Sequence, residues 1–314
     1  MNHYSLGVDF GGMSAKAGLF CNDALIAKKT VPTAEEDGAD GIAKKIADLI
    51  VAICEENSVP LSCIPAIGIG SPGIIDSENG AVLIWGNYHW KDVPLGSLVS
   101  ERIGIPVFVT NDANAAALGE VKYGGSKKFN SAIFVTLGTG VGGGIIIDGK
   151  LFEGFRGAGA EIGHMILVKD GEPCGCGRKG CFEKYASATA LIRMTKESID
   201  KHPESEMATW ETVNGRTAFD CARNGDKAAQ EVVDTYIDYL AEGLADLTNI
   251  FRPEAFLIGG GVSNEGENLM VPLRKKVEEK IFLPSTVVPL SIEKATLGND
   301  AGIYGAMAYA KSRL

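Results

Sequence analysis

The sequence predicts an α/β protein built from two related lobes. A strand, a glycine turn, a strand, a two-residue turn and a third strand occur in this order twice, at residues 4–31 and 132–153. Apolar residues at helical spacing separate further strands in both halves, as expected when helices cover a sheet. At 314 residues the chain is long enough for two domains with cores of their own. We expect the lobes to face each other and to offer their glycine turns to one cleft.

The first half is predicted to begin with three strands. Apolar alternation places them at residues 4–9, 16–21 and 24–31, with glycines at 11 and 12 and the turn Asn22-Asp23 between them. The further elements expected in this half are a helix over 42–53, a strand at 64–70, a short helix after Trp90, a strand at 107–110 and an alanine-rich helix at 113–121.

The second half repeats the opening pattern and ends in helices. Strands are expected at 132–137, 145–147, 150–152 and 255–258, with glycine loops at 138–144 and 259–261. Helices are expected at 186–199, along the apolar face that runs from Val233 to Phe251, and at 300–310. We therefore predict a small N-terminal lobe at 1–115 and a larger lobe at 116–299, with the helix at 300–314 packing back on the first lobe.

Composition argues against several classes of protein. A formal net charge of −10 with no basic run argues against a nucleic-acid surface and against an anionic membrane. The N-terminus lacks the pattern of a signal peptide, and the longest uncharged run, 130–147, is too rich in glycine to span a bilayer. Cysteines 21, 54, 63 and 221 lie in apolar or helical contexts and are expected to be reduced thiols, which places the protein in the cytoplasm.

Residues 161–183 carry the most distinctive pattern in the chain. Four ligand-type side chains lie within eighteen residues, His164, Cys174, Cys176 and Cys181. Three thiolates and one imidazole match a closed structural zinc site, and glycines between them allow the backbone to turn tightly. Unpaired thiols beside a core histidine are the alternative, which this spacing does not favour. Glu161 and Glu183 bracket the segment, so a bound metal would hold both carboxylates in place.

Three glycine turns each follow an apolar strand, at residues 11–12, 138–144 and 259–261. The middle one satisfies the pattern G-x-G-x-x-G, but a hairpin follows it where a dinucleotide-binding fold requires a helix. No lysine of the P-loop type follows any of the three. What remains is a set of backbone N–H groups that phosphate oxygens can approach without obstruction by side chains. The alternative is that these glycines serve only the turns.

Two aspartates come where strands end, the usual position for chemistry in α/β folds. Asp9 is suited to hold Mg²⁺, directly or through water, and Lys16 to be a charge partner rather than a phosphate ligand. Asp112 could accept the proton of a substrate hydroxyl during attack on a phosphoryl group. The alternatives are a turn or cap at Asp9 and a simple helix cap at Asn111 or Asp112.

With these residues in view, the chain resembles the ROK family of sugar kinases and sugar-responsive repressors, and within it the bacterial ROK glucokinases. The resemblance covers essentially the whole chain. It rests on Asp9-Phe-Gly-Gly-Met-Ser-Ala-Lys16, Ser71-Pro-Gly73, Asn111-Asp-Ala-Asn-Ala-Ala116, Leu137-Gly-Thr-Gly-Val-Gly-Gly-Gly144, Glu161-Ile-Gly-His164 and Cys174-Gly-Cys-Gly-Arg-Lys-Gly-Cys-Phe-Glu183. The last two segments together are highly specific.

The resemblance implies an actin-like (RNase H-like) ATPase fold, two α/β lobes around a central cleft in which ATP and sugar meet. It implies Asp112 as the catalytic base and His164 as a ligand of both zinc and sugar. The sugar-binding residues it implies are Asn87, Asn111, Asp112, Glu161, His164 and Glu183. The nucleotide side, taken together with the glycine turns, would comprise Asp9, Gly11, Gly12, Ser14, Lys16, Gly138, Thr139, Gly140, Gly259, Gly260 and Gly261.

Two departures from the family pattern bear on function. Met13 stands where the family usually has a threonine in the phosphate-side loop, and Ser14 beside it is the substitute hydroxyl. Family repressors carry an added N-terminal helix-turn-helix, for which a first strand starting at Tyr4 leaves no room.

The leading hypothesis is therefore ATP-dependent phosphorylation of a hexose, glucose at its 6-hydroxyl, with Mg²⁺ and a structural Zn²⁺. A kinase for an N-acetylated amino sugar or another hexose is the alternative within the same class. A catalytically weak sugar sensor is the alternative from another class, and Asp112 argues against it. The expected partners are the sugar and ATP, with no nucleic acid and no membrane, and the resemblance implies a homodimer.

Overall fold

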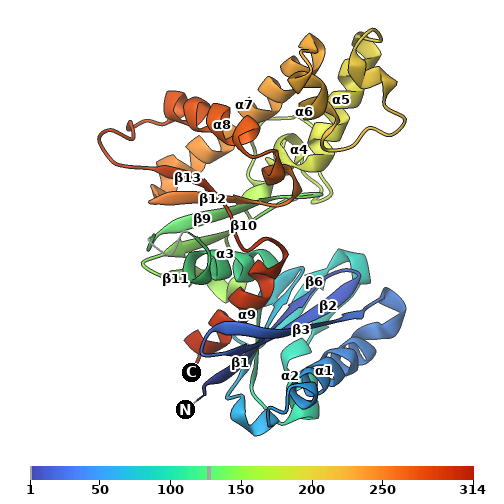
Figure 1. Cartoon of the computed structure of the whole chain (residues 1–314), viewed down its shortest axis with the longest axis vertical. Helices are drawn as coiled ribbons and strands as arrows, with labels where there is room; N and C mark the ends of the chain where they lie inside the picture. The colour runs from blue at the N-terminus through green and yellow to red at the C-terminus, as the bar shows by residue number, and fades with distance from the viewer. Residues whose placement is uncertain (1, 126–128) are drawn as a thin grey trace. The chain divides into compact units, whose positions relative to one another are not determined.

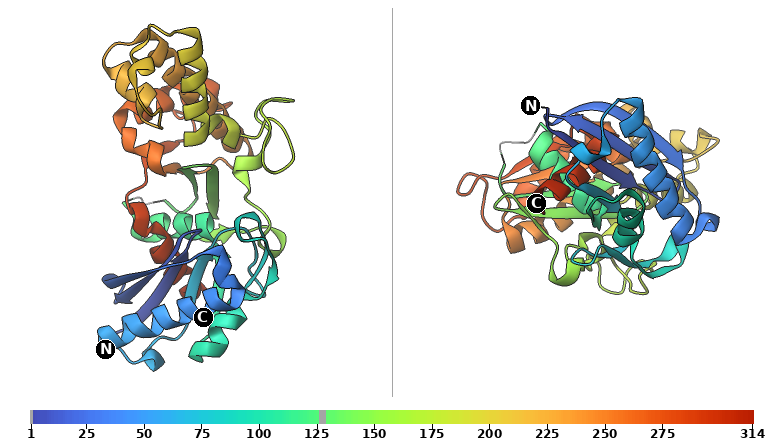
Figure 2. Two further views of the ribbon diagram at one scale, coloured as in Figure 1. Left: turned by 90° about the vertical axis from the view of Figure 1, so that its right-hand side faces the viewer. Right: turned by 90° about the horizontal axis from the view of Figure 1, so that it is seen from below.

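The computed structural model describes residues 2–125 and 129–314. Its helices and strands confirm the predicted α/β class (Figure 1). The chain divides into two compact units, the first of Met1–Asn130, Gly144–Ala160 and Leu297–Leu314, the second of Ser131–Gly143 and Glu161–Thr296. Both termini belong to the first unit (Figure 2). Among the described residues, no helix combines the length and the apolar character needed to cross a membrane.

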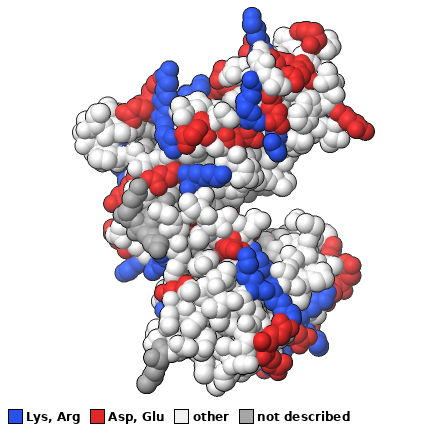
Figure 3. Space-filling model, viewed as in Figure 1, with Lys and Arg blue, Asp and Glu red and all other residues white. Residues whose placement is uncertain are grey.

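Acidic and basic side chains are interspersed on the face that Figure 3 shows. On the face shown in Figure 3, lysine and arginine lie beside aspartate and glutamate. Between two helices of the second unit, for example, Lys276 is 3.2 Å from Asp238 and Lys280 is 2.8 Å from Glu242. The surface between these two helices therefore carries both signs of charge.

The main sheet of the first unit has the strand order β3-β2-β1-β4-β8. Its strands are β1 (Tyr4–Phe10), β2 (Ser14–Cys21), β3 (Ala24–Pro32), β4 (Ile67–Ser71) and β8 (Val107–Asn111). The first three are antiparallel, and β4 and β8 join β1 in parallel. In this register Asp9 lies opposite Lys16, and Ser71 lies opposite Asn111. Asp9 and Asn111, both predicted to bind ligands, therefore lie near the ends of β1 and β8, with β4 between these two strands.

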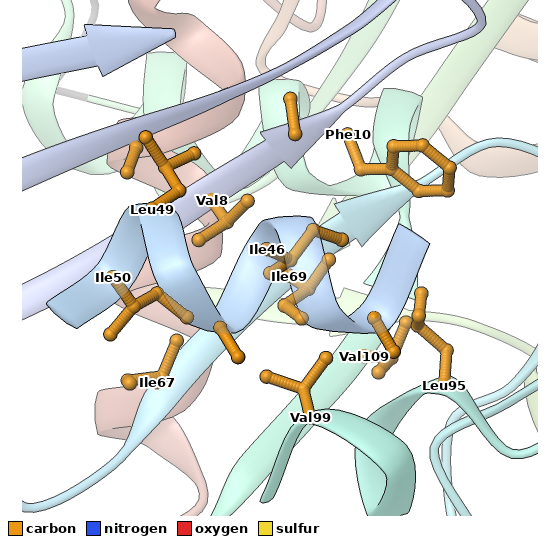
Figure 4. Packing of buried hydrophobic residues seen from close by; sticks show 14 of the residues in the cluster. Val8, Phe10, Ile46, Leu49, Ile50, Ile67, Ile69, Leu95, Val99 and Val109 are labelled. Carbon is orange, nitrogen blue, oxygen red and sulfur yellow. The ribbon is translucent and has the colours of Figure 1, made fainter. Parts of the chain in front are cut away.

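One face of this sheet is covered by α1 (Gly38–Glu56) and α2 (Leu95–Ile103). Figure 4 shows Ile46, Leu49 and Ile50 of α1 lying against Val8 of β1 and Ile67 of β4. These side chains are at most 1% exposed. Burying one such side chain stabilises the fold by about 1.5–3 kcal/mol. The helical spacing of apolar residues seen in the sequence is thus the contact surface of α1.

The other face carries α9 (Ala301–Ser312), with α3 (Asp112–Tyr123) packed along it. Glycines allow this close packing, because a Cβ at Gly68 would lie 1.8 Å from the carbonyl oxygen of Ala306, and one at Gly305 would lie 1.5 Å from that of Ala115. Because α3 packs on α9, all of α3 belongs to the first unit. The sequence instead places a lobe boundary after residue 115, inside this helix.

A small sheet in the first unit was not predicted from the sequence. It consists of β5 (Ile74–Asp76), β6 (Ala81–Trp85) and β7 (Trp90–Val93), strands too short to show a clear alternation. Aromatic rings join it to β1, with ring centroids 4.0 Å apart for Trp85 and Tyr88 and 5.4 Å apart for Phe10 and Trp85. The hydroxyl of Tyr88 donates to the carbonyl of Gly12 at 2.8 Å, which fixes the turn after β1.

A second five-stranded sheet has the order β11-β10-β9-β12-β13, and the division between the units falls within β10. Its strands are β9 (Ala132–Leu137), β10 (Val141–Ile147), β11 (Lys150–Phe152), β12 (Ala255–Gly259) and β13 (Ser291–Lys294). In the second unit β9, β12 and β13 are parallel. The predicted loop 138–144 is wrong at its end, because β10 already begins at Val141. Similarly, the predicted strand 64–70 is wrong at its start, because β4 begins at Ile67.

Helices of the second unit include one long amphipathic helix, as predicted. The helices are α4 (Glu183–Ala186), α5 (Ala188–Lys201), α6 (Thr217–Arg223), α7 (Lys227–Phe251) and α8 (Glu267–Lys280). The single predicted helix at 186–199 is wrong at its start, because Ser187 separates α4 from α5 and caps α5 through the N–H of Ala190. Neither α8 nor β13 was predicted. Pro272 lies inside α8, and the helix is rich in charge.

Candidate active site and metal cluster

The structure brings the four predicted metal ligands together in the second unit. Ligand atoms of His164, Cys174, Cys176 and Cys181 all lie within 4.8 Å of one another. Nδ1 of His164 is 3.7 Å from Sγ of Cys174, and Sγ of Cys176 is 3.6 Å from Sγ of Cys181. In a tetrahedral site with Zn–S bonds of about 2.3 Å, ligand atoms lie about 3.8 Å apart. Type, number and spacing of the donors therefore fit a zinc ion.

Short-range backbone contacts shape this cluster. Isolated bridges pair Ile166 with Cys181 and Pro173 with Lys179. Gly180 has φ +80°, and a Cβ there would lie 1.6 Å from the carbonyl oxygen of Val168, so only glycine fits. The glycine between the cysteines is thus explained at position 180 by a left-handed backbone conformation in close contact with the backbone of Val168.

The thiols of the cluster differ in their acidity without metal. A backbone hydrogen bond at Arg178 lowers the pKa of Cys176, whereas burial raises the pKa of Cys181. Because metals bind thiolates, a metal ion at this cluster would displace the proton that burial keeps on Cys181.

Glu183, at the start of α4, connects the cluster to the glycine turn after β9. Its Oε1 is 3.8 Å from Sγ of Cys174, and its Oε2 accepts a hydrogen bond from the N–H of Val141 at 3.4 Å. Glu161 begins the short 3₁₀ segment that contains His164, whose N–H donates to the Glu161 carbonyl at 3.0 Å. The Glu161 residue is exposed, yet partial desolvation by the surrounding protein raises the pKa of its carboxyl. The carboxylate of Glu183 is thus placed by contacts with the cluster, and the backbone of Glu161 is hydrogen-bonded to that of His164.

The two glycine turns of the second unit lie against each other. Gly260 has φ +79°, and a Cβ there would be 2.5 Å from the backbone of Leu137, the residue before Gly138. The helix α5 fastens the other turn, because the N–H of Ala188 donates to Gly138 at 2.8 Å and the hydroxyl of Thr189 donates to Thr139 at 2.7 Å. The arrangement presents backbone at the ends of two parallel strands, where phosphate groups can approach. A dinucleotide-binding (Rossmann) fold is excluded, because the β10–β11 hairpin, and not a helix, follows the glycine turn at residues 138–140.

In the first unit the turn after β1 carries the other predicted nucleotide residues. The N–H of Gly11 donates to the carbonyl of Ser14 at 2.8 Å, and Met13 is 85% exposed. Nζ of Lys16 lies 3.6 Å from Oδ2 of Asp9, as the sequence-based charge-partner assignment requires. Burial raises the pKa of Asp9, and Lys16 partly opposes that shift. A partly exposed carboxylate at a strand end is a suitable oxygen ligand for Mg²⁺.

Asn111, and not Asp112, caps helix α3. Its Oδ1 accepts hydrogen bonds from the N–H groups of Ala113 at 2.9 Å and Asn114 at 3.2 Å, and its Nδ2 donates to the carbonyl of Gly73 at 3.2 Å. Asp112 is the first residue of the helix, where its Oδ1 accepts from the N–H of Ala113 at 2.8 Å. The sequence left the cap open between these two residues, and the structure assigns it to Asn111.

Asn87 lies in the 3₁₀ segment Gly86–Tyr88 and is exposed. This segment lies near the end of β8, because Gly73 accepts from Asn111 and a Cβ at Gly73 would lie only 2.9 Å from the Cβ of Trp85. Asp9, Asn87, Asn111 and Asp112 belong to the first unit, and the metal cluster with Glu161 and Glu183 belongs to the second.

The sequence analysis did not identify Asp300, whose carboxylate lies beside the ammonium group of Lys16. The only feature of the sequence that could have pointed to Asp300 is its position as an acidic residue just before the C-terminal helix.

Comparisons with known proteins identify the family of this chain. The family model described as "ROK family" matches residues 5–313. The glucokinase of Thermotoga maritima is 40% identical over 315 residues, which cover 98% of this chain and 98% of that protein. A crystal structure of a ROK family glucokinase from Streptomyces griseus in complex with glucose and AMPPNP is 36% identical, with a TM-score of 0.81 over 98% of this chain and 99% of that one. A xylose repressor of Caldicellulosiruptor bescii is 36% identical and matches 77% of this chain but 61% of its own length.

Proposed function

The chain belongs to the ROK family, and from that premise we propose that it is an ATP-dependent sugar kinase that phosphorylates glucose. The fold is the actin-like ATPase fold predicted from the sequence, which the solved relatives share. The observation that carries the proposal is 40% sequence identity to a glucokinase over 98% of the chain. It is combined with a carboxylate, Asp112, that follows a strand and is not the cap of α3, because Asn111 is.

The reaction requires a base, a sugar site and a nucleotide site. The 6-hydroxyl oxygen of the sugar bonds to the γ-phosphorus while the bond from that phosphorus to the ADP oxygen breaks, and the hydroxyl proton passes to Asp112. Glu161, His164 and Glu183, together with Asn87, hold the other hydroxyls by hydrogen bonds. Asn111 can join them through the second N–H of its side-chain amide, because the first N–H donates to Gly73 and the amide oxygen accepts from the first turn of the helix.

Backbone N–H groups are the main nucleotide ligands in this proposal. The turns at Gly11-Gly12 and Ser14, at Gly138-Thr139-Gly140 and at Gly259–Gly261 receive phosphate oxygens, with Asp9 as ligand of Mg²⁺. When bound, Mg²⁺ neutralises charge on the phosphates, and zinc at the Cys/His cluster fixes the cluster segment. Nδ1 of His164 faces the cluster, which leaves Nε2 for the sugar.

Which sugar is preferred is tested by ADP release over a panel of glucose, mannose, fructose, N-acetylglucosamine and N-acetylmannosamine. We expect glucose to give the highest kcat/KM. A preference for an N-acetylated amino sugar would keep the kinase and replace its substrate. No ADP release with any sugar, in protein that binds glucose, would favour the sensor.

We further propose a homodimer in the cytoplasm. All seven cysteines are free thiols in the structure, which supports a reducing compartment. Light scattering of the purified protein measures the oligomeric state. A monomer across the accessible concentrations would contradict the dimer and leave the kinase proposal unaffected.

A further inference from the structure

Four charged side chains of the first unit form a chain of alternating sign beside β1. Lys16 Nζ is 3.6 Å from Asp9 Oδ2 and 3.7 Å from Asp300 Oδ1. The other oxygen of Asp300, Oδ2, is 2.8 Å from Lys28 Nζ. Lys16 also donates a hydrogen bond to the carbonyl oxygen of Asn299. Lys16 is therefore shared between two carboxylates and anchored near Asp300 by a backbone carbonyl.

Asp300 does not do what an aspartate before a helix ordinarily does. It occupies the N-cap position of α9, where an aspartate side chain normally accepts a hydrogen bond from the second or third N–H of the helix. Its side chain makes no such bond. Both oxygens face lysines instead, one from β2 and one from β3. A helix-capping role therefore does not account for this residue.

Partial burial strengthens the contacts of Lys16. Its side chain is 19% exposed, and those of Asp9 and Asp300 are 31% and 27% exposed. Charges shielded to this degree interact more strongly than a pair in open solvent, where an ion pair contributes little. A shift of the Lys16 ammonium group from one carboxylate toward the other therefore changes the electrostatic energy at both carboxylates.

The proposed function gives this arrangement a purpose. Asp9 is the carboxylate assigned to Mg²⁺, and an ammonium group 3.6 Å away opposes a dication at the same carboxylate. Resting on the proposed function, we infer that Asp300 is a positioning residue, which draws Lys16 away from Asp9 when the magnesium-bound nucleotide binds. Lys16 can make this move without losing its counter-charge, because Asp300 and the Asn299 carbonyl are already within reach. Asp300 acts through Lys16 and does not touch the reacting atoms.

The inference is tested by calorimetric binding of ADP to the full chain, once with excess Mg²⁺ and once with EDTA. Asp300→Asn keeps the shape of the side chain and removes its charge, so Lys16 stays on Asp9. We expect binding of Mg·ADP to weaken about tenfold and binding of ADP in EDTA to change less than about twofold, in the range of coupling between neighbouring charges. Asp300→Ser repeats the loss of charge if the first variant is insoluble.

Two further proteins make the test specific. Asp23→Asn is the matched control, because it removes another aspartate–lysine pair, between the β2–β3 turn and Lys311 of α9, and does not touch Lys16. It should bind both forms of ADP as the wild type does. In a Lys16→Met background no ammonium opposes Mg²⁺, so Asp300→Asn should change Mg·ADP binding less than about twofold.

Each other outcome overturns the inference. Normal Mg·ADP binding by Asp300→Asn would show that Lys16 does not need its second carboxylate. Equal weakening with Mg²⁺ and with EDTA would show a merely structural role, as would an undiminished effect in the Lys16→Met background. A wild-type chain that binds no Mg·ADP would contradict the proposed function itself and this inference with it.

Discussion

Gly140 lies directly against the carboxylate of Glu183, so that a Cβ at residue 140 would be 2.2 Å from Glu183 Oε2. The same oxygen accepts from the N–H of Val141, and the other lies beside Sγ of Cys174. A glycine turn predicted to bind phosphate, a predicted sugar ligand and the metal cluster therefore meet at one side chain. We therefore expect a substitution in the glycine turn or in the metal cluster to move the carboxylate of Glu183 and so to alter sugar binding.

Gly140→Ala should weaken glucose binding, because the added methyl group occupies the position of the Glu183 carboxylate. Loss of a hydrogen bond to a charged group costs about 1.5–3 kcal/mol, so we expect about a tenfold to hundredfold weaker affinity in calorimetry. Gly138→Ala is the matched control from the same turn, since a Cβ there meets no atom within 4 Å. Equal glucose affinity of the two variants would show that Glu183 is not a sugar ligand or that it moves without cost.

Purified protein should contain one zinc ion per chain, and Cys176→Ser should lose it. Structural zinc contributes on the order of 10 kcal/mol of apparent folding free energy in small peptides, so a marked fall in melting temperature is expected. Glucose binding should weaken as well, because the segment between Glu161 and Glu183 loses its fixed shape. Metal analysis and thermal denaturation check both points.

Cys63→Ser is the control for the zinc prediction, because Cys63 is an exposed thiol outside the cluster. It should keep both the metal and the melting temperature. Wild-type protein purified without chelator and found free of zinc would contradict the metal assignment.

Asp112→Asn should lower turnover by about 10²–10⁴-fold, the usual contribution of a positioned acid or base. The amide can still hydrogen-bond a hydroxyl, so glucose affinity should change far less than turnover. Stability should remain unchanged, because Asn111 caps the helix. Steady-state kinetics at saturating Mg·ATP and calorimetry with glucose check the split. Turnover within a few-fold of the wild type would return Asp112 to a structural role.

Asn111→Ala provides the complementary result for the cap of α3. Removing the side chain that accepts from Ala113 and Asn114 should lower the free energy of unfolding by about 0.5–2 kcal/mol. Urea denaturation measures this difference, with Asp112→Asn as the comparison. A larger loss in Asp112→Asn than in Asn111→Ala would reverse the assignment of the cap.

Stability at acid pH should depend on the pair Asp76–Arg156. A hydrogen bond from Arg156 lowers the pKa of Asp76 from 3.8 to about 2. Because the unfolded chain takes up this proton first, the stabilisation is complete above about pH 4 and is lost as the pH falls toward about 2. Arg156→Gln should therefore have a lower free energy of unfolding than the wild type at neutral pH. The difference in unfolding free energy between the two proteins should become smaller below about pH 4.

Urea midpoints measured between neutral pH and about pH 3 check this dependence. Lys44→Gln is the control, because the pair Lys44–Asp48 is exposed on both sides and contributes little. A constant difference between Arg156→Gln and the wild type over the whole range would show that Asp76 does not carry the effect.

Local spacing in the sequence determined much of the fold and part of the site. Apolar alternation located β1–β3 and β9, and helical spacing located the buried faces of α1 and α7. The four metal ligands could be identified because they lie in one short segment, whose turns are governed by neighbouring residues. A residue at a strand end such as Asp112 was likewise visible, since the strand that leads to it has its own pattern.

Only the tertiary structure decided how distant residues are paired. Asn111 takes the cap of α3 because of backbone angles that composition does not encode. Asp300 meets Lys16 and Lys28 because α9 returns to the sheet nearly three hundred residues after β2. The first unit gathers three separate stretches of the chain, which no local pattern could reveal. The physical reason is that periodicity records which face of an element is buried, whereas strand register and helix packing determine what that face meets.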